Sequence, residues 1–190
     1  MEIKKIISDS IAVKEAIINS EKLNKAIEDV TDSMVNGYGE GATVYFCGNG
    51  GSAADAQHIA AELSGRFYYD RPPLAAEALH VNTSYLTAVA NDYSYDEIYA
   101  RYIKGAGKKG DILVGISTSG NSKNIIRAFI EARKKGIITV AFTGESGGEM
   151  KEYSDFLINV PSSDTPRIQE SHIMIGHIIC QYVESRMFPQ

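Results

Sequence analysis

Apolar positions recur with a helical period over the first part of the chain. Apolar side chains follow one another at intervals of three or four residues, at Ile3, Ile6, Ile7 and Ile11 and then at Leu23, Ile27, Val30 and Met34. This spacing places them on one face of a helix and predicts amphipathic helices that close at Gly37 and Gly39. We therefore expect residues 1–40 to form a helical N-terminal extension.

After Gly41 the pattern changes to short apolar runs, each followed by a turn rich in Gly, Ser and Asn and, for most runs, by a helical stretch. Strands are predicted at Thr43–Cys47, Ala75–Leu79, Ile112–Ser117, Ile138–Thr143 and Phe156–Val160. Helices are predicted at Ser52–Arg66, Ser84–Asn91, Tyr95–Gly105, Ser122–Lys135 and Pro166–Met187. Such alternation is typical of a parallel sheet covered on both faces. We expect an α/β three-layer sandwich with five parallel strands in the order 2-1-3-4-5, forming a single domain over residues 1–190.

The composition and charge of the chain narrow the classes of function that the protein can have. The 190 residues suffice for one well-packed domain, and 44% hydrophobic with 23% charged residues is ordinary for a globular protein. A net charge of −5 gives no reason to expect nucleic-acid binding, which needs clustered Lys and Arg. The N-terminus lacks the continuous apolar core of a signal peptide, and no run approaches the ~20 apolar residues of a membrane span. We expect a cytoplasmic protein without a membrane or nucleic-acid partner.

The two cysteines, Cys47 and Cys180, lie in apolar stretches and lack the CxxC spacing of a zinc or redox motif. We expect both to be free, small, buried residues rather than partners in a disulfide.

In doubly wound parallel sheets, ligands bind beyond the carboxyl ends of the strands. The loop after the first predicted strand, from Gly48 to Ser52, has three glycines and ends at a helix start, where exposed amides suit an anion or a polyol. A tight turn that binds nothing explains this loop about equally well.

The loop after the third predicted strand, from Ser117 to Ser122, holds four hydroxyls and a glycine at another helix start. Side-chain hydroxyls and free amides there suit a phosphate dianion, and the absence of a P-loop lysine favours a monophosphate ester over a nucleoside triphosphate. The alternative is an over-capped helix, in which all these hydroxyls serve only to cap the helix N-terminus, but a cap needs only one hydroxyl.

Four further polar residues lie on predicted helices. His58 and Glu62 are four residues apart and share a helix face, which suits either metal ligation or an exposed polar pair. Gln169 and His177 interrupt a strongly apolar helix, where hydrogen-bonded buried polar residues are the plain alternative.

Five segments, taken together, resemble the phosphoheptose isomerases of the sugar isomerase (SIS) fold across nearly the whole chain: GNGGSAADAQHIAAEL, AVANDYSYDEIYAR, GDILVGISTSGNSKNI, AFTGESGGEM and RIQESHIMIGHIICQYVE. The resemblance is weaker just before Arg167, where this chain has Pro166 and many members of the family have a small or acidic residue.

The resemblance implies a substrate site, a metal site and an acid/base pair. Substrate-binding positions would be Asn49, Gly50, Gly51, Ser52, Glu62, Asn91, Asp92, Ser117, Thr118, Ser119, Ser122 and Gln169. A zinc ion, one per subunit, would be held by His58, Glu62, Gln169 and His177, with Glu62 and His177 as acid/base pair. It further implies a homotetramer with sites between subunits.

The implied reaction is the interconversion of sedoheptulose 7-phosphate and D-glycero-D-manno-heptose 7-phosphate through an enediol, for activated heptose and surface polysaccharides such as lipopolysaccharide. Gln169 and His177 are about 12 Å apart along a helix, so a shared metal needs either an inward bend at Gln169 or ligands from different subunits. An alternative function is a non-catalytic SIS protein that binds the replication initiator DnaA. Glu62 and His177 favour the enzyme, since we expect both to be buried, and burying them without a catalytic role would be costly.

Overall fold

The computed structural model describes residues 2–190, and its centre is a sheet of five parallel strands in the order β2-β1-β3-β4-β5. The strands are β1 (Val44–Gly48), β2 (Ala76–Ala78), β3 (Ile112–Ile116), β4 (Ile138–Thr143) and β5 (Phe156–Asn159). In register, Val44 lies beside both Ala76 and Ile112. The predicted strand order and parallel direction are confirmed, although β2 is shorter than expected.

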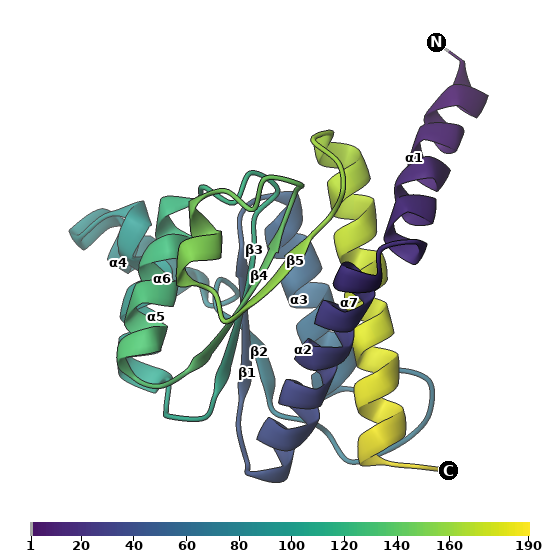
Figure 1. Ribbon diagram of the computed structural model, residues 1–190. Helices are drawn as coiled ribbons and strands as arrows, with labels where there is room; N and C mark the ends of the chain where they lie inside the picture. Colours follow the sequence, from purple (N-terminus) through teal and green to yellow (C-terminus); the bar gives the residue numbers. More distant parts are fainter. Residues whose placement is uncertain (1) are drawn as a thin grey trace.

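Helices cover both faces of this sheet (Figure 1). One face carries α2 (Glu21–Gly39), α3 (Gly51–Ser64) and α7 (Thr165–Met187). The other face carries α5 (Ile98–Ala106) and α6 (Lys123–Lys134), with α4 (Thr83–Asp92) beyond them. The predicted α/β sandwich is therefore confirmed.

The two cores follow from the alternation of side chains along the strands. Val44 and Phe46 point into the core beneath α2, α3 and α7, whereas Tyr45 and Cys47 point toward α5 and α6. This period of two is the geometry of a strand, and because helices cover both faces, every residue of β1 is buried.

Two helical segments differ from the predictions. The helix predicted at Tyr95–Gly105 begins as a separate 3₁₀ turn, η1 (Tyr95–Glu97), before α5 starts. A second 3₁₀ segment, η2 (Glu149–Tyr153), was not predicted. Both are shorter than two helical turns, so an apolar period cannot identify them.

The N-terminal helix α1 (Ile3–Ile18) projects beyond the sandwich, and Figure 1 shows its first turns standing clear of the other elements. Ile17 is its buried residue, whereas Ile3 and Ile18 are 73% and 70% exposed. In contrast, α2 packs into the core through Val30 and Met34. The predicted amphipathic helices are present, but only the second has its apolar face covered within this chain.

Both cysteines are buried and free, as predicted. Burial raises the pKa of the Cys180 thiol to about 12, so it is not a reactive thiolate. Across residues 2–190, no helix combines the length and the apolar content needed to cross a membrane.

Candidate active site and metal site

The first loop connects β1 to α3. Gly50 has φ of +57°, which a residue with a side chain rarely adopts, so the turn requires glycine there. The side chains of Asn49 and the buried Asn124 on α6 exchange two hydrogen bonds, of 3.0 and 2.8 Å. The Tyr95 hydroxyl donates a third, of 3.0 Å, to Asn49. The predicted binding residue Asn49 is thus held in one orientation.

The second loop connects β3 to α6. The Ser117 and Ser122 hydroxyl oxygens lie 2.8 Å apart, and Ser119 accepts a hydrogen bond from the Asn121 amide. Ser122 occupies the N-cap position of α6, yet its side chain makes no capping hydrogen bond. The hydroxyls are therefore not consumed by capping, which favours the anion-binding interpretation over the over-capped helix.

A cavity of about 340 Å³ opens beside this loop, and its lining includes groups that were not predicted from the sequence. The lining residues are Thr118, Ser119, Asn121, Gly144, Glu145, Ser146, Ser162, Ser163, Thr165 and Ile168. Hydroxyls dominate this set, and its single charged side chain, Glu145, is acidic. A phosphate here would rely on hydroxyls, amides and the α6 N-terminus rather than on a cation.

Asn91 and Asp92 lie at the C-terminal end of α4, where both are exposed and hydrogen bond to each other over 3.0 Å. The chain runs from there into η1, whose Tyr95 reaches Asn49. The structure thus links this segment to the first loop through Tyr95.

Three of the four predicted metal ligands come together between α3 and α7. One donor atom from each of His58, Glu62 and His177 lies within 4.8 Å of the other two. His58 Nε2 lies 3.1 Å from Glu62 Oε1, and the rings of His58 and His177 meet edge to face with centroids 5.0 Å apart. We call these residues the His58–Glu62–His177 group.

The chemistry of this group fits a divalent metal ion. Imidazole and carboxylate are the usual donors to zinc, at about 2 Å, so ligands around one ion lie within about 4 Å of one another. Small side-chain rotations would reach that from the present spacing. His177 Nε2 is buried without a hydrogen-bond partner, as expected for an atom with a missing ligand.

Gln169, the fourth predicted metal ligand, lies apart from the other three. A Cβ built on Gly51 would meet the Gln169 amide nitrogen at 2.6 Å, so this side chain packs on the first turn of α3. His58 follows Gly51 by seven residues, about 10 Å along the helix. Within one chain, Gln169 therefore lies with the first loop rather than with the other three ligands.

The group is less buried than expected. The side chains of His58 and Glu62 are 50% and 25% exposed, and His177 is half-buried. All three side chains thus stay partly exposed, although the Phe67 ring packs on His177. Nearby on α3, burial raises the pKa of Asp55, and the adjacent His58 lowers it in part.

Asn124 and Tyr95, which orient Asn49, were not predicted from the sequence. Asn124 carried a signal, because it is a polar residue on the apolar face that α6 buries through Ile125 and Ala128. Tyr95 carried none, since its reach depends on the tight turn of η1.

Comparison with known proteins identifies the family of this chain. A model of the SIS domain family matches residues 8–144. The phosphoheptose isomerase of Mycobacterium bovis (strain BCG / Pasteur 1173P2) is 56% identical over 185 residues, covering 97% of this chain and 94% of that protein. The chain belongs to the phosphoheptose isomerase family.

Solved structures of this family share the fold. Phosphoheptose isomerase GmhA from Neisseria gonorrhoeae superposes with a TM-score of 0.90 at 39% identity, covering 96% of this chain and 97% of that one. A phosphoheptose isomerase from Francisella tularensis gives 0.92 at 35% identity, covering 96% of both chains. Membership of the phosphoheptose isomerases makes this chain an aldose–ketose isomerase.

Proposed function

We propose that the protein interconverts sedoheptulose 7-phosphate and D-glycero-D-manno-heptose 7-phosphate. The observation that carries this proposal is the His58–Glu62–His177 group, an acid/base and ligand set in a chain that also has a hydroxyl-lined anion cavity. A binding protein needs the cavity but not the group. The DnaA-binding alternative draws no support from the relatives above, which are named as isomerases.

The chemistry requires two proton transfers and a fixed substrate. Glu62 removes a proton from C1 of the ketose while His177 protonates the oxygen on C2, which gives the enediol. Glu62 then returns its proton to C2 while His177 takes the proton from O1, which gives the aldose and restores both residues. Asn49, held by Asn124 and Tyr95, and the hydroxyls of the second loop would fix the sugar and its phosphate.

One zinc ion per subunit would be held by His58, Glu62 and His177, with Gln169 as the fourth ligand. Bound there, a divalent ion supplies Lewis acidity that stabilises negative charge on the enediolate oxygens. Because Gln169 packs against Gly51 in its own chain, its contribution would come from a neighbouring subunit.

The distances within one chain also support sites shared between subunits. Glu62 follows Gly51 by 11 residues along α3, a rise of about 16 Å. A heptose 7-phosphate has a chain of nine atoms from C1 to phosphorus. The backbone of three residues also has nine atoms, so the extended substrate spans at most about 11 Å. The backbone at the start of α3 and the backbone at Glu62 of the same chain are therefore further apart than the length of one substrate.

A homotetramer would bring these parts together. The exposed isoleucines of α1 and a groove of about 470 Å³ between α1, α2 and α7, lined by Ile17, Ile27 and Met174 among others, are apolar surfaces that subunit contacts would cover. The product would feed activated-heptose and surface polysaccharide synthesis in the cytoplasm.

The test is conversion of sedoheptulose 7-phosphate by the purified protein, followed by NMR with and without added zinc. We expect turnover that is lost on chelation, restored by zinc, and abolished in Glu62→Gln, which keeps the side chain's size and removes the base. Glu131→Gln, on the surface of α6, is the matched control and should keep full activity. Absence of conversion in the zinc-loaded wild type contradicts the proposal, and full activity in metal-free protein contradicts its metal part.

A further inference from the structure

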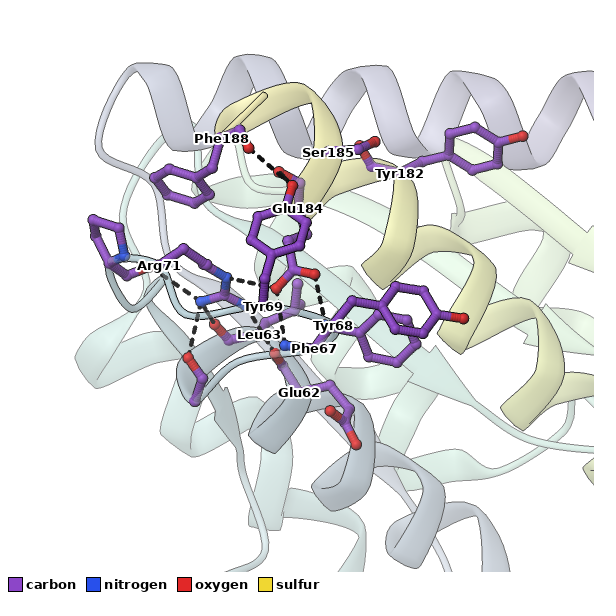
Figure 2. A network of polar contacts seen from close by, with 12 residues as sticks. Glu62, Leu63, Phe67, Tyr68, Tyr69, Arg71, Tyr182, Glu184, Ser185 and Phe188 are labelled. Carbon is purple, nitrogen blue, oxygen red and sulfur yellow. Dashed lines mark hydrogen bonds and ion pairs between the residues drawn. The ribbon is translucent and has the colours of Figure 1, made fainter. Parts of the chain in front are cut away.

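A buried ion pair joins the ends of α3 and α7 immediately beyond the His58–Glu62–His177 group. Arg71 lies in the loop after α3, and its Nε donates a hydrogen bond of 3.1 Å to Glu184 Oε1 on α7 (Figure 2). Each side chain is only 1% exposed. Burying two charges is costly and is commonly no more stabilising than an apolar pair of the same size, so stability alone does not explain this arrangement.

The guanidinium group of Arg71 is directed at the backbone that carries Glu62. The last carbonyls of a helix have no partner within it, and Arg71 supplies donors to those of α3. Its NH2 group donates to the carbonyl of Glu62 over 2.8 Å, and its NH1 group to those of Leu63 and Gly65 over 2.7 and 3.0 Å. The positive charge also complements the negative end of the α3 dipole. Arg71 therefore fixes the last turn of α3 at the residue that bears the base.

Glu184 acts on the segment that follows α3. Its carboxylate accepts hydrogen bonds from the amides of Phe67 and Tyr68, over 2.9 and 2.7 Å. Burial alone would raise the pKa of Glu184, but these two amides and Arg71 hold it below its usual value, so the carboxylate stays charged. The ring of Phe67 packs on His177, with centroids 5.6 Å apart. Figure 2 shows Glu184 beside Phe67 and Tyr68. Glu184 thus fixes the aromatic surface against which His177 rests.

We propose that Arg71 and Glu184 are positioning residues that hold Glu62 and His177 at the separation needed for metal binding and proton transfer. This inference rests on the proposed function, because it gives those two residues their roles. Neither Arg71 nor Glu184 needs to contact substrate. Both act through the backbone of α3 and through Phe67, in the way that hydrogen-bond partners behind metal ligands commonly act.

Arg71→Lys and Glu184→Gln test the pair with little change in volume. A lysine keeps the charge, but its ammonium group has three donors and cannot replace the planar fork that reaches four carbonyls, that of Pro72 included, and a carboxylate. In Glu184→Gln, an amide NH₂ group replaces an oxygen that accepts from a backbone amide or from Arg71. We expect each variant to lower kcat and the affinity for Zn²⁺ by about 10- to 100-fold, the usual effect of losing such partners. KM should change less than kcat, since neither Arg71 nor Glu184 lines the anion cavity.

A stability-matched control separates positioning from general destabilisation. Phe129→Leu, in the core on the opposite face of the sheet, lowers the melting temperature without touching α3 or α7. We expect it to leave kcat and Zn²⁺ affinity near wild type. The inference would be overturned if Arg71→Lys and Phe129→Leu, at matched melting temperature, had the same kcat and the same Zn²⁺ affinity.

A structural readout distinguishes failure of this inference from failure of the proposed function. Crystal structures of Arg71→Lys and Glu184→Gln should show the His58 and His177 rings displaced from their 5.0 Å separation. If the wild type neither isomerises the sugar nor binds Zn²⁺, the proposed function is wrong, and ring displacement still supports positioning. Unchanged ring positions in both variants overturn the positioning role whatever the activity of the wild type.

Discussion

Gly176→Ala tests whether close contact between α3 and α7 sets the geometry of the His58–Glu62–His177 group. A Cβ at this position would lie 2.4 Å from Cδ1 and 2.8 Å from Cγ1 of Ile59, well inside van der Waals contact. Overpacking of a buried contact costs about 1–3 kcal/mol. The better helix propensity of alanine offsets about 1 kcal/mol of that loss. We expect a net loss of about 1 kcal/mol in the free energy of unfolding.

Gly105→Ala is the matched control, because Gly105 also lies in a helix but a Cβ added there would have no heavy atom within 4 Å. Both variants gain helix propensity, so the difference between their melting temperatures reports the cost of the steric clash alone. At about 2–4 °C per kcal/mol for a chain of this size, Gly176→Ala should melt roughly 2–12 °C below Gly105→Ala. Differential scanning calorimetry measures this difference.

A second substitution locates the clash. Ile59→Val removes Cδ1, the atom nearest to the added methyl group, so Gly176→Ala with Ile59→Val should be more stable than the two single effects predict, by about 0.5 kcal/mol or more. Because Gly176 precedes His177, the single variant should also lower Zn²⁺ affinity. Strict additivity, or equal melting of Gly176→Ala and Gly105→Ala, would refute the reasoning.

Three further predictions concern acid stability and the anion cavity. Burial lowers the pKa of His172 to about 4, so below pH 6.5 the unfolded chain gains a proton that the folded chain lacks, and about 2 kcal/mol of stability is lost by pH 5. His172→Gln, which can keep the 3.0 Å contact with the Thr143 carbonyl, should remove this loss in urea titrations at pH 7 and 5. Ser119→Ala with Ser122→Ala should weaken substrate binding at least about 10-fold with an unchanged circular dichroism spectrum, since hydrogen bonds to a charged group contribute about 1.5–3 kcal/mol each. An unchanged dissociation constant would exclude this phosphate site. Glu145→Gln should lower KM about 2- to 5-fold, because a carboxylate near a phosphate repels it by up to about 1 kcal/mol in water; an unchanged KM would place the phosphate elsewhere.

The strands and most helices were predictable because their signals are local. The apolar runs at β1, β3 and β4 are buried on both faces, which gives continuous hydrophobic stretches between glycine-rich turns. The 3₁₀ turn η1 was not predictable, because three residues cannot distinguish its period from that of α5. Its consequence is functional, since this turn carries the Tyr95 hydroxyl to Asn49.

The sequence predicts individual candidate site residues but not how they are arranged in space. The spacing of His58 and Glu62 on one helix face follows from the sequence, whereas the approach of His177 depends on Gly176 lying against Ile59. Glycine in a helix predicts only reduced propensity, and nothing local identifies the neighbour that comes close. Arg71 likewise gave no signal, because its partner Glu184 lies 113 residues away.

The parallel packing of α3 and α7 accounts for the division of the site between two heights. Gly51 contacts Gln169 at the start of both helices, and Ile59 contacts Gly176 two turns later, so the helices run side by side in the same direction. Each of these two levels along the helix pair therefore holds residues from both helices. Gln169 lies with the first loop at the N-terminal level, and His177 lies with His58 at the level two turns further on. Gln169 and His177 both lie on α7, so the two side chains cannot approach each other unless this helix is broken between them. Within one chain, the four predicted ligands therefore stay divided between two levels of this helix pair, a division that agrees with the proposed sharing of the site between subunits.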